Sequence, residues 1–146
     1  MSKPFDPETA DNMEEIEMQF AVKAVQQAET YWNLLSSIPG SKLKLTKYDD
    51  LIYEKFIQHF PEYKNPENVR VLVEDDMKTK EAKERWREFI HHFEYIEDYN
   101  FGTLLRLSAD SEYDQEGTMF AVRIQFYAIE ITRNKHKLND WICKKN

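Results

Sequence analysis

The chain has 146 residues, close to the commonest size of one domain, with 41% hydrophobic and 32% charged residues. Its 20 basic and 27 acidic residues give a formal charge of −7, which opposes direct binding of nucleic acid. The single cysteine, Cys143, excludes an intramolecular disulfide, and no window approaches the roughly 18 apolar residues of a membrane span. The N-terminus lacks the apolar run of a secretory signal, so we expect a cytoplasmic protein, with the nucleus left open as a second compartment.

The first elements in chain order are a lead-in and a long helix. Residues 1–10 contain two prolines and are expected to be flexible. Asp11 and Glu14 have the spacing of a capping box, in which each side chain bonds an orphan amide at a helix start. The helix predicted from there ends before Pro39. Apolar residues that recur every three to four positions predict its buried face: Ile16, Phe20, Ala24, Ala28, Tyr31 and Leu35.

Two further helices are predicted in the middle of the chain. One begins near Thr46 and ends at Pro61, because proline keeps the preceding residue out of helical angles. The other spans Thr79 to Phe93, with Glu81 and Arg85 spaced to form an ion pair on its exposed side. The expected buried stripes are Tyr48, Ile52, Phe56 and Phe60 on the first, and Ala82, Trp86, Phe89, Ile90 and Phe93 on the second.

The remaining segments are ambiguous. The alternating valines at 69, 71 and 73 fit either a short strand or a loop packed on the core, and residues 103–108 fit a strand or a short helix. Residues 118–134 contain both a helical and an alternating apolar pattern. We favour a helix there, because about 16 residues is long for a strand and a basic residue such as Arg133 suits a helix C-terminus.

These elements predict a mostly α fold: a single-domain helical bundle of about four to five helices. A minor, short β-hairpin in the C-terminal half stays open as an addition. The expected organisation is a lead-in at 1–10, one globular domain at 11–135 and a basic C-terminal tail at 136–146.

The sequence contains none of the motifs that commonly carry catalysis or hold a cofactor. Its three glycines are too far apart for a phosphate-binding loop or a dinucleotide fingerprint. His91 and His92 are adjacent, so on a helix they point apart and cannot grip one metal ion together. The acidic run at 110–114 lacks the glycine and the closing glutamate of a calcium loop. We therefore expect no catalytic residue, no cofactor and no metal, and a protein that works by binding another protein.

Three segments of the C-terminal half form a distinctive combination: WREF at 86–89, DYNFGTLLRL at 98–107 and RIQFYAIEITRN at 123–134. Through them the sequence resembles the polysaccharide biosynthesis domain-containing protein family of small eukaryotic cytosolic proteins, from the first long helix to Asn134. The resemblance implies a dedicated chaperone of translation elongation factor 1-alpha. In that role the protein is recruited to the ribosome through the nascent polypeptide-associated complex, where it meets the nascent GTP-binding domain. It is released when the client binds GTP and folds.

Six residues are candidates for partner binding. They are Arg106, Arg123, Arg133 and Asn134 in the matched segments, and Glu14 and Glu15 in the acidic N-terminal stretch. An acidic stretch suits a basic client or a ribosome-associated surface. The competing interpretation of the arginines is structural: Arg123 with Glu130, or Arg106 with Asp98, inside the fold. Their apolar neighbours, expected in the core, are Leu104, Leu105, Ile124 and Phe126.

Two other functions stay open at this point. An adaptor or scaffold would bind a mature, GTP-loaded translation factor. An enzyme of polysaccharide biosynthesis, which the family name suggests, would need a small-molecule pocket. A chaperone released by its client's own nucleotide needs no ATP site, which agrees with the missing glycine loops. Neither a membrane nor direct nucleic-acid contact is expected.

Overall fold

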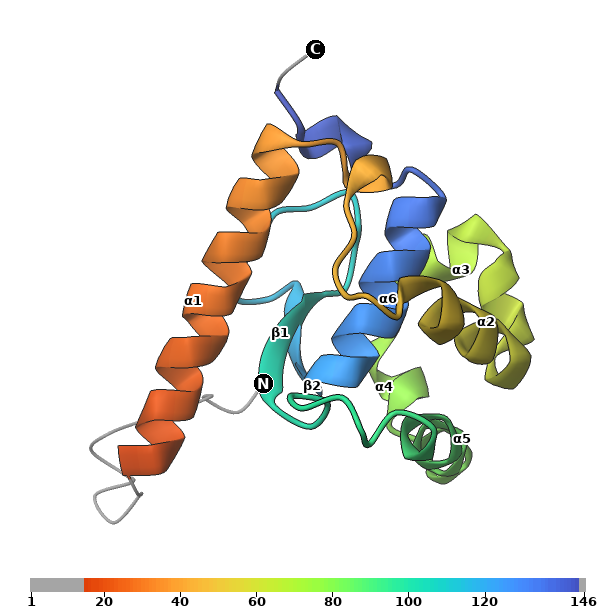
Figure 1. Cartoon of the computed structure of the whole chain (residues 1–146). Coiled ribbons are helices and arrows are strands. Elements are labelled where there is room, and N and C mark those ends of the chain that lie inside the picture. Colours follow the sequence, from red (N-terminus) through yellow and green to blue (C-terminus); the bar gives the residue numbers. More distant parts are fainter. Residues whose placement is uncertain (1–14, 145–146) are drawn as a thin grey trace.

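The computed structural model describes residues 15–144, with side chains from residue 21 onward. This part forms one domain of six α-helices and a two-stranded antiparallel sheet (Figure 1). The helices are α1 (Glu15–Ser37), α2 (Asp49–His59), α3 (Pro66–Arg70), α4 (Glu74–Met77), α5 (Lys80–His91) and α6 (Arg123–Lys135); the strands are β1 (Gly102–Arg106) and β2 (Thr118–Val122); 3-10 turns lie at Gly40–Lys42, Pro61–Lys64 and Asp140–Ile142. The predicted fold class, a mostly α single domain, is confirmed, and the short hairpin that the sequence left open in the C-terminal half is present.

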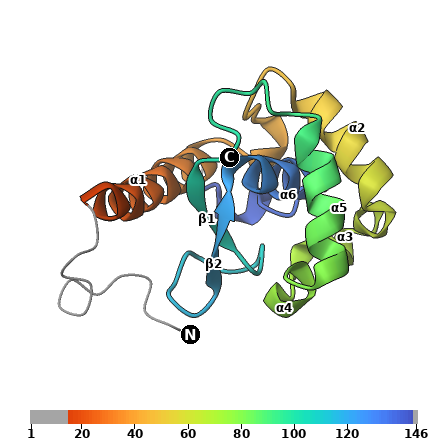
Figure 2. The ribbon, with the colours of Figure 1, turned by 90° about the horizontal axis from the view of Figure 1, so that it is seen from below.

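Helix α6 is the centre of the fold. It runs between the β-hairpin on one side and α2, α3 and α5 on the other (Figures 1 and 2). Nine of its thirteen residues are buried, including apolar Phe126 and Ile129 but also the charged Glu130 and Arg133. Because this helix is enclosed on nearly all sides, its polar side chains must find their partners inside the protein.

The hairpin lies between α1 and α6 (Figure 2). Its strands pair in the register that sets Gly102 opposite Val122 and Leu104 opposite Phe120. Of the two alternatives for residues 103–108, the strand is therefore right for most of the segment.

The helix predicted for residues 118–134 is wrong for its first five residues, which form β2. In this stretch Met119 and Ala121 are buried while Phe120 between them is exposed, which is the period of a strand. The helix begins one residue after Val122, whose amide donates to Gln125 Oε1 at 3.0 Å. The helical pattern is thus confirmed from Arg123 onward, whereas the strand ends at Val122, so the alternating apolar positions 122, 124 and 126 fall mostly in α6 and do not mark it.

Helix α1 packs mainly on β1 and stands away from α2 and α5 (Figure 1). Thr103 of β1 donates a hydrogen bond to Gln27 of α1 at 2.7 Å. The predicted apolar face is confirmed where its side chains are described, and its buried residues are Ala24, Ala28, Tyr31 and Leu35. The expected capping pair, Asp11 and Glu14, lies outside the described residues.

A cluster of aromatic rings joins α2 to α5. The Phe56 ring lies 5.6 Å from that of Trp86 and 5.7 Å from that of Phe89, centroid to centroid. Such close ring pairs add to the free energy gained by burying large side chains. Helix α5 begins as predicted, since Thr79 Oγ1 accepts the amide of Ala82 at 3.0 Å.

Two details of residues 62–85 differ from expectation. Arg85 pairs with Glu62 at 2.8 Å rather than with Glu81, because its guanidinium turns back toward the end of α2. The valine segment fits neither alternative fully: Val69 belongs to helix α3, and Val71 lies outside any strand, exposed, with one isolated bridge to the segment after β1.

The chain stays packed on the domain after Lys135, where we expected a tail to start. Asn139 and Ile142 are buried, and the last 3-10 turn rests on α1. The domain therefore continues to the end of the described residues. No helix within residues 15–144 is long and apolar enough to cross a membrane.

The packing around Gly40 can be tested with a matched pair of glycine substitutions. A Cβ at Gly40 would overlap Asn134 Oδ1, which is held by a 2.7 Å hydrogen bond from Asn139. Gly40→Ala should therefore lower the free energy of unfolding by about 1–3 kcal/mol, measured by urea denaturation. Gly102→Ala should change it by less than about 0.5 kcal/mol, because its Cβ would meet nothing within 4 Å. Equal effects would contradict this account of the packing.

Candidate interaction surface

The centre of the domain holds a buried ionic triad. Glu130 on α6 accepts from Arg133 Nη1 at 2.8 Å and from Arg106 Nη2 at 3.2 Å, and all three side chains are fully buried. Arg133 lies one turn along the same helix, whereas Arg106 reaches in from the end of β1. The triad therefore links the hairpin to the central helix through charge-assisted hydrogen bonds.

Three neutral side chains complete this network. Tyr31 of α1 donates to Glu130 Oε1 at 2.8 Å, and Asn139 Nδ2 donates to the same oxygen at 2.9 Å. Asn134 in turn donates to the Tyr31 hydroxyl at 3.2 Å. The network thus draws α1, α6, β1 and the C-terminal segment onto one carboxylate.

Most of the remaining guanidinium donors bind backbone carbonyls, while Arg106 Nη2 also donates to Asn139 Oδ1 at 2.6 Å and Arg106 Nε has no hydrogen-bond partner. Arg133 Nε donates to the carbonyl of Val69 at 2.8 Å, and its Nη1 donates to that of Arg106 at 2.9 Å. Arg106 Nη1 donates to the carbonyls of Ala109 and Ser111, each at 3.0 Å. These contacts fix the positions of the short helix α3 and of the loop that follows β1.

The electrostatics of the triad follow from its composition. Burial alone would raise the pKa of Glu130, but the two arginines outweigh it and bring that pKa down to about 2. Burial, followed by the charge of Glu130, raises the pKa of Tyr31 well above its ordinary value. At neutral pH the cluster thus holds one carboxylate and a neutral phenol between two guanidinium groups.

The structure brings three of the six candidate residues into this network: Arg106, Arg133 and Asn134. Their side chains lie inside the domain and are closed to a partner, so the structural interpretation holds for them. The pairing differs from both expected pairs, because Arg106 takes Glu130 while Arg123 takes Asp98 at 2.9 Å. The sequence offers several acidic residues of suitable charge for each arginine. The register of the hairpin decides which of them lies close enough to pair.

The other candidates lie elsewhere. The Arg123 side chain is partly exposed at the start of α6, where Tyr127 shares Asp98 with it through a 2.9 Å hydrogen bond. Glu14 lies outside the described residues, and the Glu15 side chain is likewise not described. Among residues whose side chains are described, no group of three or more His, Cys, Asp or Glu side chains could hold a metal ion.

An apolar surface is exposed on the hairpin. Phe120 is 52% exposed, and its ladder partner Leu104 and its strand neighbour Val122 are half-buried on the same face. Gly102, opposite Val122, leaves open space beside them. We call Gly102, Leu104, Phe120 and Val122 the hairpin face. A solvent-exposed aromatic ring on a paired strand is suited to contact another apolar surface.

Sequence reasoning missed this face. The helix predicted for residues 118–134 includes Phe120, and Leu104 is expected in the core, although of the four expected core residues only Leu105, Ile124 and Phe126 are buried. The signal that could have revealed it is the alternation over residues 118–122, which predicts one exposed side chain between two buried ones.

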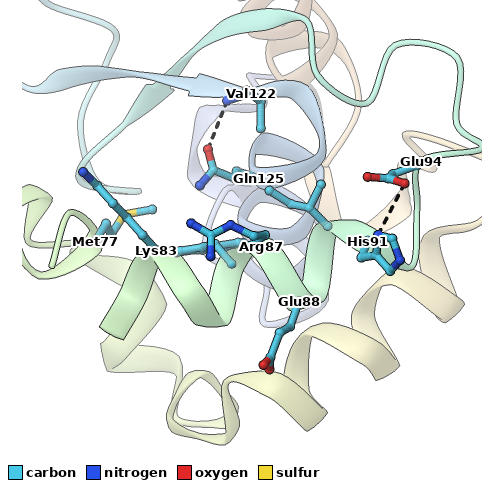
Figure 3. Close-up of a pocket in the computed structure, with 10 residues that line it drawn as sticks. Met77, Lys83, Arg87, Glu88, His91, Glu94, Val122 and Gln125 are labelled. Carbon is cyan, nitrogen blue, oxygen red and sulfur yellow. Dashed lines mark hydrogen bonds and ion pairs between the residues drawn. The ribbon is translucent and has the colours of Figure 1, made fainter. Parts of the chain in front are cut away.

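A groove adjoins the hairpin face and shares Val122 with it. It lies between α5 and the start of α6, has a volume of about 710 Å³ and is open to solvent (Figure 3). Apolar side chains of Met77, Trp86 and Ile90 line it, and Lys83, Arg87 and His91 follow one another along its α5 wall. This arrangement can hold apolar and charged groups of a ligand together.

Comparisons with known proteins agree with one another. The family model of the PBDC1 protein matches residues 16–144. A PBDC1 homolog of Saccharomyces cerevisiae is 67% identical over 94% of this chain and 95% of its own, and that of Schizosaccharomyces pombe is 54% identical over 99% of both. Human protein PBDC1 is 45% identical over 90% of this chain, which spans 55% of the human protein.

A solved structure also matches. The solution NMR structure of a Saccharomyces cerevisiae protein, 65% identical, superposes with a TM-score of 0.85 over 97% of this chain and 98% of the other. Fold and core thus define a single-domain, mostly helical protein whose central helix and hairpin are joined by a buried ionic triad. The chain belongs to the PBDC1 family, whose name stands for polysaccharide biosynthesis domain-containing, so the resemblance read from the sequence is confirmed.

The triad predicts a large effect of one neutralising substitution. Glu130→Gln should lower the free energy of unfolding by about 3–5 kcal/mol, because it leaves two buried guanidinium groups without a counter-charge. Asp50→Asn is the matched control, since it removes a carboxylate that pairs with Lys135 at 2.8 Å on the surface. The control should unfold almost as the parent does. A Glu130→Gln protein as stable as the control would show that the triad is dispensable.

The low pKa of Glu130 predicts acid sensitivity. A carboxyl whose pKa falls from 4.5 to about 2 on folding stabilises the fold above about pH 4.5 and loses this contribution as the pH falls toward 2. The contribution is on the order of 3 kcal/mol. A ¹³C NMR titration of the Glu130 carboxyl should give a midpoint near 2, and stability should fall over the same range. A midpoint at or above 4.5 would mean that burial outweighs the arginines.

Proposed function

We propose that this protein is a co-translational chaperone that binds the nascent GTP-binding domain of translation elongation factor 1-alpha and is released when the client folds around GTP. Membership of the PBDC1 family supports the proposal through the resemblance described above. The structural observation that carries it is the hairpin face, where Phe120 is 52% exposed beside Leu104 and Val122. We assign client binding to this face.

The physical reasoning starts from the client. Switch segments of a GTPase are ordered by contacts to nucleotide, so before GTP binds they are loose and leave apolar side chains uncovered. An exposed apolar strand face on a rigid frame can cover such side chains. A chaperone that binds only the loose form loses its affinity for the client once GTP orders these segments, and the client is then released. The release therefore draws on the client's own nucleotide, and the chaperone acts as a binding protein without a cofactor and not as an enzyme.

Recruitment is part of the same proposal. Association with the nascent polypeptide-associated complex would bring the protein to the ribosome before the GTP-binding domain has folded. The acidic N-terminal stretch with Glu14 and Glu15 is the candidate contact, because its negative charge attracts basic surfaces over long range. The site of action is then the cytoplasm, where translation takes place.

The test is a pull-down from actively translating extract with ribosome-bound nascent chains preserved. Newly made elongation factor 1-alpha should be enriched without GTP and lost when GTP is added. Phe120→Ser should reduce the recovery at least about tenfold, since it removes a large apolar contact of about 1.5–3 kcal/mol from the hairpin face. Leu51→Ser on α2, a residue 42% exposed, is the matched control and should bind as the parent does.

Other results would contradict the proposal. Equal recovery of the mature, GTP-bound factor would indicate an adaptor. Equal binding by Phe120→Ser and Leu51→Ser would remove the hairpin face as the client site. Absence of any enrichment would exclude elongation factor 1-alpha as the client.

A further inference from the structure

The α5 wall of the groove between α5 and α6 carries two positive side chains. Lys83 and Arg87 lie four residues apart on its α5 wall and are exposed. Neither forms an ion pair with a carboxylate among residues whose side chains are described, although the chain carries a net charge of −7. In Figure 3 Arg87 points toward Gln125, whereas Glu88 points away from the groove. Two cations thus face the groove without a counter-ion.

Two other features of the groove favour a positive electrostatic potential there. The N-terminus of α6, a helix of thirteen residues, opens into it at Val122 and Gln125, and the positive end of a helix dipole favours negative charge. Of the two carboxylates that line the groove, Glu94 pairs with His91 at 3.4 Å and Glu88 points away from the groove in Figure 3. The unpaired charged groups that face the groove are therefore positive.

The floor between these cations is apolar. Met77, Trp86, Ile90 and Val122 line it, and only the last two are partly exposed. A free inorganic anion would pair with the cations and leave the apolar floor exposed to water, whereas the phosphate backbone of a nucleic acid would be repelled by the chain's net charge of −7. A ligand that satisfies both features carries apolar side chains on one face and carboxylates beside them.

We propose that this groove docks an acidic amphipathic segment of a partner protein. Its apolar side chains lie on Ile90 and Val122, and its carboxylates pair with Lys83 and Arg87. This is the helix-in-groove mode of recognition, with charge complementarity fixing the orientation. The site lies beside the hairpin face and does not depend on the identity of the client.

The test uses the full chain labelled with ¹⁵N and a designed helical peptide with Leu at every third or fourth position and Glu elsewhere. Titration should shift the resonances of Val122, Gln125 and the Trp86 indole. A peptide of the same design with Lys in place of Glu should bind at least about tenfold more weakly, as should the acidic peptide to Lys83→Glu/Arg87→Glu. Lys42→Glu/Lys64→Glu reverses two exposed charges elsewhere and should bind the acidic peptide as the parent does.

Several outcomes would overturn the proposal. They are absence of binding by the acidic peptide, equal binding of both peptides, and shifts confined to other elements. If a peptide with the sequence of residues 1–14 binds more tightly than the designed acidic peptide, the occupant of the groove is the chain's own leading segment and not a partner protein. If the parent self-associates and Lys83→Glu/Arg87→Glu does not, the occupant of the groove is a second copy of this chain.

Discussion

One carboxylate, Glu130, holds the centre of this domain together. It pairs with two fully buried guanidinium groups and balances one of their two positive charges, and the cost of removing three charges from water is offset only because their geometry and hydrogen bonds are nearly complete. Since Arg106 belongs to β1 and Arg133 to α6, the attraction fixes the hairpin against the central helix. Tyr31 and Asn139 then add α1 and the C-terminal segment to the same point. A polar centre of this kind specifies one arrangement of the elements more sharply than apolar packing does.

This constraint decides which surfaces are left for binding. Three of the four polar residues that stand out in the matched segments, Arg106, Arg133 and Asn134, are buried inside the fold, and the surfaces most open to a partner are of another kind. They are the apolar hairpin face around Phe120 and the groove whose wall carries Lys83 and Arg87. Both surfaces meet at Val122, where β2 ends and α6 begins. Because the triad anchors both elements, the two surfaces are held in a fixed relation to each other.

Much of the fold could be predicted from periodicity and caps. The 3.6-residue stripes of α1, α2 and α5, and the start of α5 at Thr79, are local features that the sequence determines directly. Residues 118–122 could not be assigned, because alternation over five residues also fits the flank of a helical stripe until a partner strand is known. The pairing of Arg106 with Glu130 was missed for a similar reason: several acids could neutralise it, and only the tertiary register selects one. Exposure of Phe120 likewise depends on that register.

The proposed function and the structure meet in one claim: a rigid hairpin held by Glu130 presents an apolar face to a client that lacks nucleotide. Amide hydrogen exchange tests it most directly, on this protein alone and mixed with the nucleotide-free GTP-binding domain of elongation factor 1-alpha. The account predicts added protection within residues 102–106 and 118–122 in the mixture, and its loss when GTP is supplied. Protection confined to α2 and α3, or unchanged by GTP, would contradict it.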